Sequence, residues 1–354
     1  MKIILFEDSE GYVQEYLLAI RKVLGGKGEA ILFQRGADRS GDGTYDKHLE
    51  EDLSLPQYHD ASLIVADLDL SKIPGYQGLS EGTVRKVSDS LGLPECSYAR
   101  GPDQDSDLER SGEQRESTIT VSLRNGADGF AEQVVSIAEG FAYIAHQLPD
   151  SLKATAKKTP GKVLATILGK PEYADKISLF ASGDQNRLAS VLSVRGSVQE
   201  KDRRLTCMLG YWLWDSVLRY PGVLLNVAAT SSYLNILEAA FRDDQQVRDL
   251  FKRARYAGPF AGAKEPMWWR GMIDDIVARS EAEDGREFAS KTLKKDVPRS
   301  QCCENPSMPA GYYCMLSKQP VSLQNSKGGL AWFPRGADLA RVSNKKFEEL
   351  GPWL

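Results

Sequence analysis

Three carboxylates follow the first and third strand-like segments of the chain. Glu7 and Asp8 come directly after the apolar run at residues 2–6, and Asp67 follows the apolar run at residues 61–66. Crowded carboxylates repel unless a cation neutralises them, and an all-oxygen site with room for water suits Mg²⁺. The sequence therefore predicts an Mg²⁺ site formed by Glu7, Asp8 and Asp67. The alternative is that Glu7 and Asp8 only cap the helix that follows them.

The segments around these carboxylates alternate between strand-like and helix-like patterns over the first 150 residues. Continuous apolar runs followed by helical periodicity are typical of a parallel sheet covered by helices. A long polar loop is expected between the second and third strands, and an amphipathic helix of about five turns after the fifth strand. The carboxyl ends of parallel strands meet at one edge, where the three carboxylates would lie together. Strands are expected at residues 2–6, 30–33, 61–66, 94–99 and 118–123, and the loop at 35–58.

The acidic motifs resemble those of the receiver domain of bacterial response regulators, over about residues 1–148. The resemblance rests on the pair Glu7-Asp8 after the first strand and on Asp67 within the segment V-A-D-L-D-L, which also contains Asp69. It implies a doubly wound, flavodoxin-like fold with five parallel strands. It also implies that Asp67 accepts a phosphoryl group from a histidine kinase or another phosphodonor, while Glu7, Asp8 and Asp67 hold Mg²⁺.

Two other receiver positions depart from the family pattern. The family has Lys followed by Pro after the fifth strand, whereas this chain has Arg124 followed by Asn125. The resemblance implies that Arg124 contacts a phosphoryl oxygen. A guanidinium can bind a phosphoryl group in bidentate geometry, through two N–H groups. The family also has Ser or Thr near the end of strand four. That position falls on Ala99 here, and Ser97 lies two residues earlier on the same strand face.

The remainder of the chain differs in charge and pattern. Residues 1–150 contain 14 Lys and Arg against 27 Asp and Glu, and residues 151–354 contain 31 against 22. We expect a linker at 149–161, followed by a mainly helical, basic domain at 162–354 with an irregular tail from residue 300. Interleaved arginines and aromatic residues in this half are compatible with nucleic acid or another anionic ligand. A structural or partner-binding role is the alternative. The interleaved arginines and aromatic residues are Trp212, Trp214, Arg219, Tyr220, Arg253, Arg255, Tyr256, Trp268, Trp269 and Arg270.

Composition argues against several other classes of protein. Five cysteines and three histidines in 354 residues favour neither a disulfide framework nor a metal cage. The pair Cys302-Cys303 has no histidine in the same half of the chain, which argues against histidine-dependent thiol catalysis. No apolar run approaches the length of a membrane helix, and no signal-peptide core follows the first residues. We expect a cytoplasmic protein without a membrane partner.

The resemblance to receiver domains implies a signalling protein of the two-component type. Its receiver-like domain would accept a phosphoryl group on Asp67, with Arg124 and Ser97 nearby, and the second domain would regulate a partner. A companion role is a phosphate sink for the kinase. In this reading the protein is a phosphoacceptor regulator and not a turnover enzyme. The alternative is a pseudo-receiver scaffold whose basic domain binds nucleic acid or another anionic ligand.

Overall fold

The computed structural model describes residues 1–35, 44–68, 70, 73, 76, 79–98, 119–155, 158–181 and 197–351. They form two compact units. The first unit contains the described residues up to Leu168 and helix α8 (Val198–Trp212). The second contains the described residues from Gly169 to Ala181 and those from Leu213 onward. The expected linker at 149–161 does not coincide with these boundaries. It contains the end of α4 (Gly126–Ala154) and the start of α5 (Pro160–Ile167), because both helices pack within the first unit.

A parallel sheet of five strands forms the centre of the first unit. Its strand order is β2-β1-β3-β4-β5, and every neighbouring pair is parallel. This order confirms the predicted doubly wound, flavodoxin-like fold. All five residues of β3 are buried, as expected for a strand that is apolar on both faces. The strands are β1 (Lys2–Phe6), β2 (Glu29–Leu32), β3 (Leu63–Asp67), β4 (Glu95–Tyr98) and β5 (Ile119–Val121).

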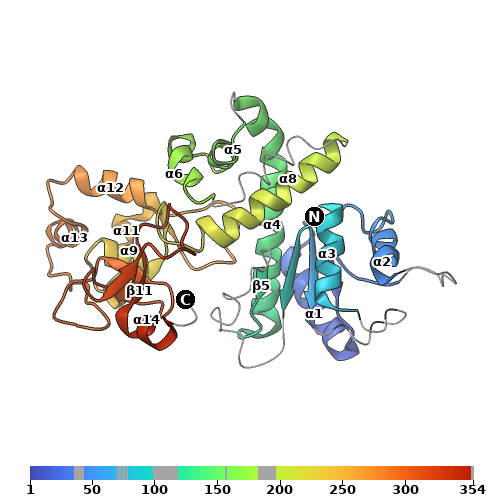
Figure 1. The fold of residues 1–354 in the computed structure, drawn as a ribbon, viewed down its shortest axis with the longest axis horizontal. Helices are drawn as coiled ribbons and strands as arrows, with labels where there is room; N and C mark the ends of the chain where they lie inside the picture. The colour runs from blue at the N-terminus through green and yellow to red at the C-terminus, as the bar shows by residue number, and fades with distance from the viewer. Residues whose placement is uncertain are drawn as a thin grey trace. The chain divides into compact units, whose positions relative to one another are not determined.

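Helices cover both faces of this sheet (Figure 1). On one face, Phe6 and Ala66 pack in a core cluster with residues of α2 (Tyr45–Leu53) and α3 (Glu81–Leu91). On the other face, Tyr98 packs its ring against those of Tyr16 in α1 (Glu10–Leu24) and Phe130 in α4. Side chains alternate along a strand, so each strand supplies both cores.

Helix α2 lies in the segment that we expected to be a long polar loop. Its composition is mostly polar and charged, but Leu49 and Leu53 are fully buried in the cluster that covers the sheet. The expectation of a continuous loop was therefore wrong for residues 45–53. Two leucines four residues apart form one side of a helix, and the tertiary contact outweighs the weak local propensity.

Helix α8 packs against α4 through a glycine. A Cβ atom placed on Gly210 would overlap the ring of Phe141, which is itself 1% exposed. The two helices therefore approach closely at a point where only glycine fits. This contact holds α8 in the first unit although it follows α4 by more than forty residues.

We expect Gly210→Ala to destabilise the protein by about 1–3 kcal/mol, because the added methyl group forces the Phe141 ring out of its packed position. Alanine in an exposed helix would instead stabilise by up to about 1 kcal/mol. Gly82→Ala in α3 is the matched control, since its Cβ would meet no atom closer than 3.7 Å. Urea unfolding of the two variants measures the difference. Equal effects of the two substitutions would contradict the close helix contact.

The second unit is mainly helical, as predicted, and also contains two small sheets. Strands β6 and β7 pair with each other, and a four-stranded sheet has the order β10-β11-β8-β9. The tail after residue 300 is therefore more ordered than we expected, because β8, β9, β10, β11 and α14 all lie within it. The helices are η1 (Pro171–Tyr173), α6 (Ala174–Ser178), η2 (Leu213–Val217), α9 (Val227–Tyr233), α10 (Glu238–Asp243), α11 (Gln245–Leu250), η3 (Lys252–Ala254), α12 (Arg270–Ala278), α13 (Gly285–Leu293) and α14 (Asn344–Leu350). The strands are β6 (Leu224–Leu225), β7 (Trp268–Trp269), β8 (Tyr312–Cys314), β9 (Pro320–Val321), β10 (Ser326–Gly328) and β11 (Ala340–Ser343).

Within the described part of the chain, no helix combines the length and apolar character that crossing a membrane requires.

Candidate functional site

The carboxyl edge of β1 and β3 carries the predicted acidic residues. Phe6 is in register with Ala66, so Glu7 follows β1 at the level of Asp67, the last residue of β3. Strands β2 and β3 lie on opposite sides of β1, so the strand order reverses at β1. The carboxyl edge of β1 and β3 is therefore the topological switch point of the sheet. Open α/β sheets bind their ligands at such points. Asp8 is the next residue along the chain and is half-buried.

Both oxygens of the Glu7 carboxylate accept hydrogen bonds from within the protein. The backbone N–H of Ser9 donates to Oε1 at 2.8 Å, and the hydroxyl of Tyr98 donates to Oε2 at 2.8 Å. Glu7 is only 5% exposed and Asp67 only 3%. A buried carboxylate needs such donors, since burial removes its hydration. Glu7 is thus held in place by the fold itself.

The donor set suits a cation, but the three carboxylates do not form a preformed metal centre. Among the residues that the structure describes, no group of three or more His, Cys, Asp or Glu side chains is arranged to hold a metal ion. The two hydrogen bonds to Glu7 give a physical reason, because a metal ion would compete with Ser9 and Tyr98 for its oxygens. Mg²⁺ commonly binds one or two carboxylates and keeps several waters.

Ser97 is not brought beside Asp67. It is in register with Ala66, whereas Tyr98 is in register with Asp67. Residues level with each other in neighbouring parallel strands share a face, so Ser97 belongs to the face covered by α2 and α3. It is fully buried, and its Oγ atom has no hydrogen-bond partner among the described residues. Asp69 and Ala99, the other positions named for the resemblance to receiver domains, lie outside the described residues.

Arg124 lies in the turn that connects β5 to α4. It is exposed, and its backbone N–H donates to the hydroxyl of Ser122 at 3.3 Å. Val121, the last residue of β5, is in register with Tyr98, so Arg124 lies beyond the same edge of the sheet as the carboxylates.

Sequence reasoning missed Tyr98, whose hydrogen bond to Glu7 connects residues 91 positions apart. Only the strand register brings these two side chains together.

The aromatic side chains of the second half are mostly core residues. Trp214, Trp268 and Trp269 are 8%, 2% and 4% exposed, and Tyr256 is 5% exposed. Trp214 packs edge-on against Phe260. Bases stack on exposed rings in single-strand binding proteins. These buried rings offer no such platform, although Arg253 and Arg255 nearby in the chain are exposed.

Cys303 and Cys314 do not have the character of nucleophilic thiols. Partial burial raises the pKa of the Cys303 thiol to about 11, so it carries little thiolate at neutral pH. Cys314 is fully buried, and its Sγ atom accepts from the backbone N–H groups of Ser317 and Ser343. These thiols act as small buried or surface groups.

Comparisons with models of protein families and with curated proteins give no match for this chain.

Proposed function

We propose that this protein is a two-component-type signalling protein whose first unit accepts a phosphoryl group on Asp67. The observation that supports the proposal is the position of Asp67, which ends β3 at the switch point of a 2-1-3-4-5 sheet, level with Glu7. A carboxylate in this place can act as a nucleophile toward a phosphorylated donor. The second unit would regulate a partner, and a role as phosphate sink for a histidine kinase uses the same chemistry.

In this proposal each residue of the edge has a separate role. A carboxylate oxygen of Asp67 attacks the phosphorus as the bond from phosphorus to the donor breaks, so that acetate leaves from acetyl phosphate or a histidine imidazole leaves from a kinase. Asp8 and Asp67 would hold Mg²⁺. The ion would supply charge neutralisation to the phosphoryl oxygens when bound. Arg124, at the same edge, would contact a phosphoryl oxygen through its guanidinium. Glu7, held by Ser9 and Tyr98, contributes negative charge at a fixed position.

Intact-mass detection after incubation with acetyl phosphate and Mg²⁺ tests the proposal. A small donor suits this site because Asp67 is only 3% exposed. We expect one phosphoryl adduct on the wild type and none on Asp67→Asn. The matched control is Asp60→Asn, because Asp60 pairs with Lys2 at the opposite end of β1 and should leave the adduct unchanged. An adduct that persists in Asp67→Asn would assign phosphorylation to another residue.

The second candidate function is a pseudo-receiver scaffold. The observation that favours it is the engagement of both Glu7 oxygens, together with the placement of Ser97 on the opposite face from Asp67. With Glu7 engaged by the protein and Ser97 on the other face, the described part of this site lacks two features of the receiver pattern. The absence of any adduct on folded wild-type protein, with Mg²⁺ saturating, would favour this scaffold and contradict phosphorylation by this donor.

A further inference from the structure

The second unit contains two adjoining cavities that share a basic wall. One measures about 570 Å³ and the other about 660 Å³. Both are lined by Lys252, Arg255, Glu265 and Pro266. Cavities of this size accommodate small molecules. Together with the loop at residues 256–267, these residues form what we call the basic pocket.

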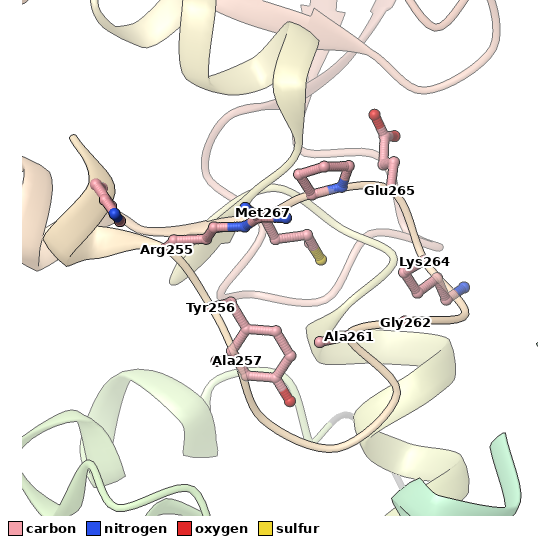
Figure 2. A pocket seen from close by; sticks show the side chains of 10 residues that line it. Arg255, Tyr256, Ala257, Ala261, Gly262, Lys264, Glu265 and Met267 are labelled. Carbon is pink, nitrogen blue, oxygen red and sulfur yellow. The ribbon is translucent and has the colours of Figure 1, made fainter. Parts of the chain in front are cut away.

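A closed loop shapes one side of the basic pocket (Figure 2). Arg255 pairs with Trp268 as a β-bridge, and the backbone N–H of Tyr256 donates to the carbonyl of Met267 at 2.7 Å. The loop between them is anchored by Phe260, which is 1% exposed. Figure 2 shows Arg255 extending alongside Met267 at the base of the loop. The cavity wall is thus built by hydrogen bonds and packing.

Most charged side chains around the basic pocket have an ion-pair, hydrogen-bond or ring partner. Arg242 forms an ion pair with Glu238, and Arg248 donates to the side chain of Gln245 at 2.6 Å. Lys264 places its ammonium over the ring of Trp214, 3.7 Å from the centroid. The two acids of the larger cavity each accept a hydrogen bond from an amide side chain, Glu265 from Asn226 and Asp249 from Gln245.

Lys252 and Arg255 are the exceptions. Both are exposed, and within the described residues neither side chain has an ion pair or a hydrogen bond. Lys252 begins η3 and Arg255 follows its end in an extended conformation, and both side chains line both cavities. These two cations outnumber Glu265, the acid that lines both cavities with them, so the shared wall would attract a ligand with more than one negative group. A guanidinium and an ammonium both suit phosphate oxygens.

We infer that the basic pocket binds a small ligand that carries linked phosphate groups. The Arg255 guanidinium would bind one phosphate through two N–H groups, and Lys252 would neutralise the next. The observations favour a small ligand over nucleic acid, because the neighbouring rings of Trp268 and Tyr256 are buried and cannot stack on bases. The inference goes beyond phosphorylation of Asp67 and does not depend on it.

Isothermal titration of the full-length protein with inorganic tripolyphosphate tests the inference. We expect saturable binding of one molecule per chain. The double variant Lys252→Gln/Arg255→Gln should weaken binding by at least about tenfold, since each charge-assisted hydrogen bond to phosphate is worth more than 1 kcal/mol. Both side chains are exposed, so the variant should fold normally, and a thermal melt checks this.

Arg253→Gln is the matched control. Arg253 lies between Lys252 and Arg255 in sequence and is exposed, but it lines neither cavity. We expect its loss to change the affinity by less than about twofold, as for a screened surface charge. An equal loss in Arg253→Gln and the double variant would overturn the inference, as would the absence of saturable binding. Tighter binding of a short single-stranded oligonucleotide, lost in the double variant, would also overturn it and assign the surface to nucleic acid.

Discussion

Glu95→Gln is expected to raise the free energy of unfolding at pH 8. The effect of the substitution at pH 8 should exceed its effect at pH 4 by about 4 kcal/mol. Glu95 is the first residue of β4 and is 1% exposed. Neither of its carboxylate oxygens has a hydrogen-bond partner among the residues that the structure describes. Burial raises the pKa of this carboxyl to about 8, with a further increase from the neighbouring Glu81 and a decrease from Arg85.

The direction of the pH dependence follows from this raised pKa. An unfolded glutamate has a pKa near 4.5, whereas folded Glu95 keeps its proton up to about pH 8. Between these values the unfolded chain releases a proton that the folded protein retains, so stability falls as the pH rises. The contribution of the Glu95 carboxyl to stability is complete below about pH 4.5 and is lost as the pH rises through about 8. Glutamine mimics the protonated acid at every pH and removes this loss.

Urea unfolding of wild type and Glu95→Gln at pH 4, 6 and 8 measures the effect. The two stability curves should converge at pH 4 and separate steadily toward pH 8. Glu132→Gln is a suitable control because Glu132 is exposed on α4 and should not alter the pH dependence. Parallel curves for wild type and Glu95→Gln would contradict the raised pKa.

Tyr98→Phe is expected to lower the free energy of unfolding by about 2–3 kcal/mol at pH 7, because it removes a hydroxyl that donates to a buried carboxylate. The hydroxyl lies 2.8 Å from Oε2 of Glu7, and Glu7 is 5% exposed. Phenylalanine keeps the ring contacts with Tyr16 and Phe130, so the loss reports the hydrogen bond. Freed of this donor, Glu7 becomes available to a cation, and Mg²⁺ should stabilise the variant more than the wild type.

Chemical denaturation with and without Mg²⁺ checks both parts of this expectation. Tyr58→Phe is the matched control, since the Tyr58 hydroxyl contacts only the backbone of Gln34 beyond the end of β2. That variant should show no change in Mg²⁺ dependence. A Tyr98→Phe protein as stable as the wild type would contradict the importance of the Glu7 hydrogen bond. Equal Mg²⁺ effects in the wild type and in Tyr98→Phe would contradict the expectation that this hydrogen bond competes with a cation for Glu7.

The interior of the first unit followed largely from local sequence pattern. Apolar runs at residues 2–6 and 61–66 predicted β1 and β3, and the periodic apolar positions after the fifth strand predicted α4. Carboxyl ends of parallel strands share an edge, which brought Glu7 and Asp67 together without further information. Helix α2 was missed because its stability comes from Leu49 and Leu53 in a distant core rather than from its own polar residues.

The contacts of the two candidate sites depend on long-range geometry. Strand register decides that Tyr98, and not Ser97, is level with Asp67, and a shift of one residue would reverse their faces. In the second unit, the sequence analysis named Arg255 among the residues compatible with an anionic ligand, but only the closure of the loop at 256–267 places it with Lys252 on a cavity wall. The sequence alone determined the sheet and the edge where its acids lie, because side-chain periodicity is a local property. Only the tertiary structure decided which groups hold Glu7 and which cations lack a counter-charge, because these depend on pairing between residues far apart in the chain.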